Sequence, residues 1–463
     1  MSKAQINKGK VYLAGGGPGD PGLLPRRTLD LMSRVDVICY DALINPALLA
    51  LAPEDADMEA VGYRGYNGGI VYGMHPRVIE LANQGKSVLR LKAGDPFIFG
   101  RGTEECRDLN DHQIPFEIIP GITAGLGASV YAGFPLTSGG MASDVTLASG
   151  HMSSTALTSW ESMGKGSGTL VLYMASKKID KCVDRLVKNG RNPQTPVIHI
   201  SAATSAEQVE TEGTLETIAE KIAALNNENP AIIIVGEVVG LRSEMNWRAK
   251  LPMNQQRVLI AGRNLHTMQA ALEDMGAISM SLPLWTPEYL IDSIRWKNIC
   301  SEKVIAFADR QSACAFKRAL PEFGLDIRKL AGIRLIACGE HSYNVLKEIG
   351  LTDTEQMSKS ELPKDALLLH GPRSVGNHSK CLQVWQRKAL KQRFRLERAD
   401  KVYVDDRFSL EALCQLQEFD KIKGATWYTR HKTLIPLGEK YGLDFRYIKN
   451  APQKEMAVEM SEN

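Results

Sequence analysis

The sequence predicts an α/β protein with mostly parallel sheets, because short apolar strand patterns alternate with helical patterns along the chain. In the first hundred residues the order is KVYLAG, PRRTLDLMSR, VDVICYD, a further helix and SVLRLKAGDP. A second series follows from about Pro120, with VTLASG, GTLVLYMAS, TPVIHISAA and AIIIVGEVV. Strands joined by crossover helices pair in parallel, so this alternation indicates parallel sheets. With 463 residues, the chain has room for about three domains.

Composition and charge exclude several classes of protein. Apolar residues make up 44% of the chain and charged residues 24%, which is typical of a globular protein. The net charge of +3 does not indicate nucleic-acid binding, and no window reaches the ~20 apolar residues of a membrane span. The start MSKAQINKGK lacks the apolar core of a signal peptide, and the eight cysteines form no C-x-x-C pair. We therefore expect a cytoplasmic protein with reduced thiols, no metal site, and no nucleic-acid or membrane partner.

The polar segment Asn246–Gln256, NWRAKLPMNQQ, predicts a domain boundary before the fresh strand RVLIAG. Beyond it the chain contains a faint duplication, KVIAFADRQSACAFKRAL at Lys303–Leu320 and KVYVDDRFSLEALCQL at Lys401–Leu416. Each copy reads as a strand, then [AD]-D-R-x-S, then an amphipathic helix. Asp309 and Asp406 stand where a helix N-cap accepts hydrogen bonds from free backbone N–H groups. We expect two similar α/β lobes here.

The glycine loop YLAGGGPGDPGLL contains Gly17, Gly19 and Gly22 at the spacing of the G-x-G-x-x-G dinucleotide fingerprint. That fingerprint needs a helix N-terminus at the glycines, and the prolines inside GPGDPG prevent one because they lack N–H groups and restrict the preceding residue. The first helical position is predicted near Pro25, at N1. No G-K-[ST] follows, so the loop is not a P-loop either.

Three further loops follow strands and are rich in small residues. They are LKAGDPFIFGRGTEE, IIPGITAGLGASVYAGFPLT and LYMAS. Ligands of open α/β sheets bind at the carboxyl ends of strands, where small residues let the backbone approach closely. The set predicts a ligand held largely by main-chain groups.

These loops, together with VICYDALI, resemble the successive motifs of the uroporphyrinogen-III C-methyltransferases, which are tetrapyrrole methylases that use S-adenosylmethionine. The resemblance runs from about residue 8 to 248 and includes GDPFIFGRG almost letter for letter. It implies two α/β lobes, 8–120 and 121–248, with the cofactor in the cleft between them, and a homodimer. The implied cofactor-binding residues are Pro18, Ala93, Gly94, Asp95, Ile98, Thr123, Ala124, Met174 and Ala203.

The resemblance also implies the chemistry. This family methylates uroporphyrinogen III twice, which gives precorrin-2 on the way to sirohaem and cobalamin-type cofactors. It assigns Asp41 as proton acceptor and places Tyr63 where the family has a lysine as proton donor. The eight substrate carboxylates favour arginines, for which Arg64 and Arg101 are the candidates. Arg26 and Arg27 are further candidates, or they belong to a solvated first helical turn.

The sequence departs from the family pattern at positions expected to meet the substrate. Ala42 replaces an arginine, Tyr63 the lysine, and Ser138 and Gly139 a histidine and an arginine. At the cofactor, Ala202 and Ala203 replace an Asn-Gly turn, and alanine disfavours a positive φ. Cofactor binding is therefore better preserved than substrate recognition. The substrate is held differently, or activity on uroporphyrinogen III is reduced, or another tetrapyrrole is used, or the chain binds a tetrapyrrole without catalysis.

Residues 256–463 resemble uroporphyrinogen-III synthase, which closes hydroxymethylbilane between two α/β lobes. The motifs are RVLIAGRN, IAFADRQSACAF, IRLIACGEHSYNVLKEIG and LLLHGPRS, the last similar to a strand that enters the second lobe. The family's Thr-Ser pairs become Ala308-Asp309 and Asp405-Asp406, which would repel a polyanion. The region is therefore either a diverged active synthase or a structural module. His341 and His431 are either acid–base groups or solvated loop residues.

Overall fold

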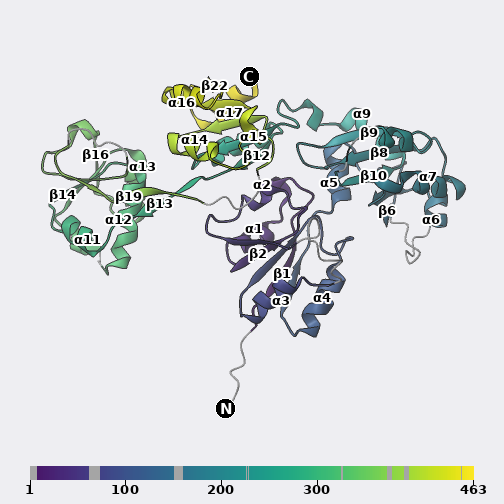
Figure 1. Ribbon diagram of the computed structural model, residues 1–463, viewed down its shortest axis with the longest axis horizontal. Helices are drawn as coiled ribbons and strands as arrows, with labels where there is room; N and C mark the ends of the chain where they lie inside the picture. Colours follow the sequence, from purple (N-terminus) through teal and green to yellow (C-terminus); the bar gives the residue numbers. More distant parts are fainter. Residues whose placement is uncertain are drawn as a thin grey trace, which may run out of the picture. The chain divides into compact units, whose positions relative to one another are not determined.

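The computed structural model describes residues 8–61, 73–150, 160–225, 227, 229–324, 327–372, 378–390, 396–449 and 451–462. The chain divides into two compact units. One contains Met1–Leu282 together with Gln392–Asn463, and the other contains Pro283–Lys391. Figure 1 shows open sheets covered by helices, as the alternation of patterns predicts.

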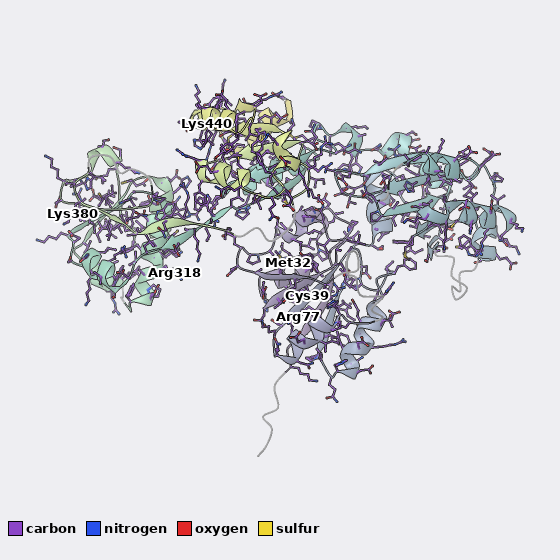
Figure 2. The ribbon with its side chains drawn as sticks, in the orientation of Figure 1. Met32, Cys39, Arg77, Arg318, Lys380 and Lys440 are labelled. Carbon is purple, nitrogen blue, oxygen red and sulfur yellow. The ribbon has the colours of Figure 1, made fainter. Side chains whose placement is uncertain are left out.

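The first sheet is fully parallel, with strand order β3-β2-β4-β1-β5. Its strands are β1 (Val11–Gly15), β2 (Val37–Tyr40), β3 (Asp57–Ala60), β4 (Val88–Lys92) and β5 (Phe116–Ile119), and its helices are α1 (Arg26–Met32), α2 (Pro46–Leu49), α3 (Pro76–Asn83) and α4 (Gly102–Asp111). The central strands β1 and β4 are buried almost throughout because helices cover both faces, and β4 buries the charged Arg90 and Lys92 among its apolar residues. Cys39 of β2 lies inside this core (Figure 2), and its burial raises the pKa of the thiol to about 12.

The second sheet has strand order β6-β7-β10-β8-β9 and is parallel only between β6 and β7. Its strands are β6 (Val145–Ser149), β7 (Thr169–Tyr173), β8 (Pro196–Ser201), β9 (Val209–Thr214) and β10 (Ala231–Val235), and its helices are α5 (Ala124–Tyr131), α6 (Trp160–Lys165), α7 (Ile179–Lys188), α8 (Ile218–Ala223) and α9 (Arg242–Met245). A mostly parallel sheet was predicted, and that is wrong here. A hairpin joins β8 to β9, and β10 returns between β7 and β8 in the opposite direction.

The third sheet, in the same unit, is fully parallel with order β12-β11-β20-β21-β22. Its strands are β11 (Arg257–Ala261), β12 (Ile278–Ser281), β20 (Lys401–Val404), β21 (Thr426–Thr429) and β22 (Phe445–Tyr447), and its helices are α10 (His266–Asp274), α14 (Arg407–Cys414), α15 (Asp420–Lys423), α16 (Ile435–Lys440) and α17 (Gln453–Glu462). We call the described residues of 256–282 and 396–462 the C-terminal lobe.

The second unit contains a fourth sheet, parallel, with order β16-β15-β14-β17-β18, and the antiparallel ribbon β13–β19. Its elements are β13 (Trp285–Tyr289), α11 (Ser293–Cys300), β14 (Val304–Phe307), α12 (Arg310–Glu322), β15 (Arg334–Ala337), α13 (Glu340–Glu348), β16 (Glu355–Gln356), β17 (Leu367–His370), β18 (Cys381–Gln383) and β19 (Trp385–Ala389). Across both units, short 3-10 helices lie at Pro21–Leu23, Ser176–Lys178, Glu237–Leu241, Arg248–Lys250, Ile327–Leu330, Lys359–Glu361 and Lys432–Leu434.

The predicted duplication is confirmed. The two copies form β14 with α12 and β20 with α14, and each strand is the middle one of its sheet. Asp309 caps α12 by accepting the Ser312 N–H, and Asp406 caps α14 by accepting the Ser409 N–H. One expectation is wrong, because β17 pairs with β14 and so does not enter the other lobe. The fourth sheet is an insertion between two halves of the third.

Candidate active site

A cleft of about 740 Å³ opens at the carboxyl ends of the first sheet's strands and at the facing loops of the second sheet. All nine residues that the resemblance implies for the cofactor line it, namely Pro18, Ala93, Gly94, Asp95, Ile98, Thr123, Ala124, Met174 and Ala203. They come from loops after β1, β4, β5, β7 and β8, which are far apart in the sequence. The structure therefore brings the predicted set into one site.

Close approach of three loops explains the glycines at the floor of the cleft. The Gly17 N–H donates to the Gly94 carbonyl at 3.2 Å, and the Gly94 N–H donates to the Gly17 carbonyl at 2.7 Å. A Cβ at Gly15 would lie 2.5 Å from the Gly94 carbonyl oxygen and 2.6 Å from the Cα of Gly121. No side chain fits between these backbones. The glycines therefore let the loops contact one another through their main chains, and they leave main-chain groups exposed to the cleft.

The prolines of the glycine loop act as the sequence predicts, with one difference. Asp20 caps the 3-10 helix Pro21–Leu23 by accepting the Gly22 N–H, and α1 begins at Arg26 with Pro25 as its N-cap rather than at N1. No α-helix begins within GPGDPG. Pro18 packs against α5, since a Cβ at Gly127 would lie 2.6 Å from Pro18 Cγ.

Polar contacts join the two walls of the cleft. Asp20 accepts the Tyr131 hydroxyl at 2.7 Å and donates its own N–H to Thr204 Oγ1 at 3.1 Å. The Asp95 carboxylate accepts the backbone N–H groups of Phe97 at 2.8 Å and Gly121 at 2.9 Å. Asp95 therefore holds two loops in place as well as lining the cleft.

Tyr173 supports the start of α5 at the back of the cleft. Its hydroxyl lies 2.8 Å from Thr123 Oγ1 and accepts the Gly125 N–H at 2.9 Å. Burial raises the pKa of the hydroxyl, so it stays protonated at neutral pH. The Phe99 ring packs on Tyr173 with 4.8 Å between ring centroids. This contact closes one side of the site.

Five residues around the cleft adopt a positive φ although they are not glycine. They are Phe99, Arg101, Met174, Ala202 and Thr204. The expectation that alanine avoids this conformation is wrong at Ala202, whose φ is +47°. The surrounding loop enforces it, because Ala202 N–H donates to Pro230 O and its carbonyl accepts from Ser205 N–H. Such strain costs about 1–3 kcal/mol per residue and collects at functional sites.

Asp41 belongs to a buried group of four charges that sequence reasoning missed. Its Oδ1 lies 2.5 Å from Arg90 Nη2, and Lys92 Nζ lies 3.9 Å from its Oδ2. Glu105 Oε1 accepts from Lys92 at 2.9 Å and lies 3.2 Å from Arg90. The Asp41 side chain is 22% exposed, whereas those of Arg90, Lys92 and Glu105 are 5–7% exposed. Asp41 is therefore the member of the four that solvent or a ligand reaches.

A signal for this group was present in the sequence. Arg90 and Lys92 alternate with apolar residues in the strand VLRLK, so they lie on one face of a buried strand. Buried charges need partners, and the ends of neighbouring elements supply Asp41 and Glu105. Burial disfavours the charged guanidinium, but the charges of Asp41 and Glu105 outweigh it and raise the pKa of Arg90.

Of the remaining residues expected to meet the substrate, some line the cleft and others do not. Ala42 lines the cleft beside Asp41, whereas Arg101 is exposed at the N-cap of α4 and is not among the lining residues. Tyr63 and Arg64 lie outside the described residues. Arg27 pairs with Glu117 at 3.2 Å, which fits the solvated first turn of α1.

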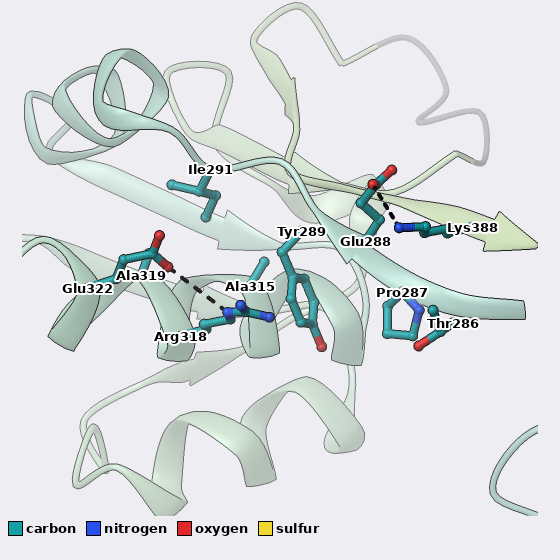
Figure 3. Close-up of a pocket in the computed structure, with 10 residues that line it drawn as sticks. All are labelled: Thr286, Pro287, Glu288, Tyr289, Ile291, Ala315, Arg318, Ala319, Glu322 and Lys388. Carbon is teal, nitrogen blue, oxygen red and sulfur yellow. Dashed lines mark ion pairs between the residues drawn. The ribbon is translucent and has the colours of Figure 1, made fainter. Parts of the chain in front are cut away.

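In the described residues of 256–462 the aspartates of the two [AD]-D-R-x-S copies have structural partners. Asp309 accepts Trp385 Nε1 at 3.0 Å, and Asp405 accepts the Tyr403 hydroxyl at 3.0 Å and pairs with Arg430 at 2.8 Å. His431 lies 3.6 Å from Asp405, whereas His341 is exposed on α13. A second cavity, of about 300 Å³, lies in the second unit between β13 and α12 and contains none of these residues (Figure 3).

Comparison with known proteins gives matches that include the first and second sheets, whose loops line the cleft. The family described as Tetrapyrrole (Corrin/Porphyrin) Methylases matches residues 10–219. A Sinorhizobium protein named uroporphyrinogen-III C-methyltransferase is 43% identical over 246 residues, which are 52% of this chain and 88% of that protein. A Bacillus subtilis protein of the same name is 32% identical over 383 residues, 81% of this chain and 79% of its own length.

Two other matches cover a smaller share of the relative or have a low structural similarity score. A siroheme synthase of Pseudomonas aeruginosa is 44% identical over 246 residues, so this chain spans about half of that protein, 53%. The solved uroporphyrin-III C-methyl transferase of Thermus thermophilus, complexed with S-adenyl homocysteine, is 32% identical with a TM-score of 0.43, over 50% of this chain and 93% of that one. In the described residues no helix is long and apolar enough to cross a membrane. On the Sinorhizobium and Bacillus matches, this chain belongs to the tetrapyrrole methylase family.

Proposed function

We propose that this chain transfers methyl groups from S-adenosylmethionine to carbon atoms of uroporphyrinogen III and forms precorrin-2, the precursor of sirohaem and cobalamin-type cofactors. One observation carries the proposal: nine implied cofactor residues, distant in sequence, line a single cleft beside Asp41 and Ala42. The relatives named uroporphyrinogen-III C-methyltransferase support the same substrate and reaction.

The residues present fit S-adenosylmethionine. Thr123 and Ala124 begin α5 at the cleft, and a helix N-terminus favours an anionic group such as the cofactor's carboxylate. The Asp95 carboxylate suits its ammonium group, and Met174, a residue that is 57% exposed, offers a polarizable surface. When bound, the cofactor supplies a methyl group on a sulfonium, a strong electrophile that an electron-rich pyrrole carbon attacks.

The chain's own residues align this attack and remove a proton. The methylated pyrrole carbon already bears a side chain and has no hydrogen, so methylation leaves a cationic ring that must lose a proton from a neighbouring position of the macrocycle, and Asp41 is our proposed acceptor. The Arg90 guanidinium fixes the Asp41 carboxylate in position, and Asp41 is partly exposed and precedes Ala42, which lines the cleft. Arg64 and Arg101 as carboxylate ligands, and Tyr63 as proton donor, stay predictions.

We also propose that 8–120 and 121–248 are the two methylase lobes, that 256–463 is a synthase-like domain, and that the methylase is a homodimer. The first and second sheets lie within the methylase ranges, and the third and fourth within 256–463. Light scattering of the purified chain tests the dimer. Supplying hydroxymethylbilane and separating the I and III isomers of uroporphyrinogen tests synthase activity.

The methylase proposal is tested by incubating the full chain with S-adenosylmethionine and uroporphyrinogen III under anaerobic conditions. We expect the absorption spectrum of precorrin-2, or of sirohydrochlorin after oxidation. Cofactor binding without methylation of uroporphyrinogen III contradicts the proposal. Methylation of a different tetrapyrrole would then identify the alternative substrate, and no methylation of any would favour a binding protein.

A further inference from the structure

The cleft has a third wall, which the C-terminal lobe provides. Residues of β11, β12, α15 and the segment before β20 line it beside the loops of the first two sheets. Leu259 and Met280 supply apolar surface there, and Arg257, Arg398 and Lys421 supply charge. A region that resembles another enzyme therefore forms part of the proposed methyl-transfer site.

The positive charge of the cleft comes from this wall. Among the described lining residues of the first and second sheets and their loops, the charged ones are Asp95 and Glu207, both acidic. Each lysine or arginine in the described lining belongs to the C-terminal lobe. Neither acid attracts a ligand with many carboxylates, and such a ligand needs cations for charge-assisted hydrogen bonds.

Contacts hold this wall in place against the methylase loops. Arg257 Nη1 pairs with Glu207 at 2.9 Å, and Arg263 forms an ion pair with Glu54. Gln255 Nε2 donates to the Gln208 carbonyl at 2.9 Å. The Arg257 guanidinium is thus engaged in the attachment and neutralises Glu207.

The other two cations keep donors for a ligand. Lys421 Nζ donates to the Leu396 carbonyl at 2.7 Å, which uses one of its three N–H groups. The Arg398 side chain is 74% exposed, with Asp400 3.9 Å away. The Glu397 carboxyl also lines this wall, and it opposes an anionic ligand. The wall therefore holds two cations that can reach substrate and one acid that disfavours it.

We propose that Arg398 and Lys421 of the C-terminal lobe bind carboxylates of the tetrapyrrole in the methyl-transfer cleft, so that this lobe is part of the methylase's substrate site. The inference rests on the proposed function for the identity of the substrate. It also explains how the cleft can hold an anionic substrate although the first and second sheets and their loops contribute Ala42 and, among the described lining residues, no lysine or arginine.

The test uses the full chain with both cations removed, Arg398→Ala with Lys421→Ala. Binding of oxidised uroporphyrin III, which is not methylated, is followed by quenching of tryptophan fluorescence, and S-adenosylhomocysteine binding by calorimetry. Loss of two charge-assisted contacts is expected to raise the uroporphyrin Kd at least about tenfold. The S-adenosylhomocysteine Kd stays within about twofold, and the salt dependence of uroporphyrin binding becomes weaker.

Matched variants separate a contact from a change in folding. The pair Arg398→Lys with Lys421→Arg keeps the charges and should restore most of the affinity. Glu397→Gln should tighten uroporphyrin binding, the opposite direction. Lys423→Ala and Lys440→Ala remove exposed lysines of the same lobe that are not in the described cleft lining (Lys440 is labelled in Figure 2). Neither substitution should change the Kd for uroporphyrin III or for S-adenosylhomocysteine.

An unchanged uroporphyrin Kd in the double variant overturns the inference, as does a wild-type chain that does not bind uroporphyrin III. The proposed function fails separately. If the wild type binds uroporphyrin III and the double variant loses it, but no methyl transfer occurs, the inference stands and the activity does not. If the wild type methylates and the double variant does so with an unchanged KM, the activity stands and the inference fails.

Discussion

The Asp41 carboxylate lies 2.5 Å from the guanidinium of Arg90, at the point where β2 ends beside β4. Arg90 is itself buried against Glu105 at 3.2 Å, so a second acid fixes the position of the cation that fixes Asp41. A carboxylate held in this way keeps one defined orientation next to Ala42, which lines the cleft. The pair gives the proposed proton acceptor its orientation.

Asp41→Asn keeps the shape of the side chain and removes its basicity. We expect kcat for methyl transfer to fall about 10²–10⁴-fold, the usual contribution of a positioned general base. The S-adenosylhomocysteine affinity should change less than about twofold, because Asp41 is not among the lining residues of the cofactor cleft. Steady-state kinetics and calorimetry on the same preparation check both values. A wild-type turnover rate would remove Asp41 from the mechanism.

Glu105→Gln tests the buried charges below Asp41. The substitution leaves Arg90 and Lys92 with one carboxylate between them in a site that is almost fully buried. Breaking a buried pair costs about 3–5 kcal/mol, so we expect a loss of that size in the free energy of unfolding. Urea denaturation measures it. Glu104→Gln, one residue earlier on the exposed face of α4, is the control and should cost under about 0.5 kcal/mol. Equal costs for the two variants would contradict the role of Glu105.

Gly127→Ala tests the packing of Pro18 on α5. The added methyl group would lie 2.6 Å from Pro18 Cγ and 3.2 Å from Thr204 Cγ2, so Pro18 must move away from the helix. We expect the S-adenosylhomocysteine Kd to rise about tenfold or more, since misplacement of a positioning group by 1 Å has effects of this order. Gly139→Ala, where the methyl group meets nothing within 4 Å, should leave the Kd unchanged. An unchanged Kd for Gly127→Ala would mean that Pro18 does not shape the cofactor site.

Ala202→Gly tests the backbone strain in the turn after β8. Ala202 has a φ of +47°, which glycine adopts without steric cost. Removing the steric strain of Ala202 stabilises the folded state by more than the extra entropy of glycine stabilises the unfolded chain. The free energy of unfolding should therefore rise by up to about 1 kcal/mol. Ala206→Gly in the same loop, where φ is not positive, should instead lower it. Thermal unfolding followed by calorimetry distinguishes the two signs, and a loss at Ala202 would show that the turn is unstrained.

Local patterns in the sequence predicted the parts of the structure that depend on local chemistry. The strand–helix alternation predicted the parallel first sheet, and the [AD]-D-R-x-S copies predicted the caps at Asp309 and Asp406. The family resemblance of the loop motifs implied the nine residues that line the cleft, and their role in cofactor binding stays a prediction. Each of these signals lies within a few consecutive residues.

Features that depend on long-range pairing were not predicted. The strand AIIIV is apolar on both faces and reads the same in either direction, so the antiparallel placement of β10 is invisible in its pattern. The positive φ of Ala202 is imposed by two hydrogen bonds, in which the Ala202 N–H donates to the Pro230 carbonyl and the Ser205 N–H donates to the Ala202 carbonyl. The contribution of Lys421 to the cleft depends on how the C-terminal lobe packs, which no local motif encodes.

The central claim is tested most directly by mass spectrometry of uroporphyrinogen III after anaerobic incubation with the full chain and S-adenosylmethionine. We predict a product that gains two methyl groups, with two molecules of S-adenosylhomocysteine released for each, and no such product from Asp41→Asn on the same time scale. A chain that binds S-adenosylhomocysteine but leaves uroporphyrinogen III without added methyl groups would contradict the account.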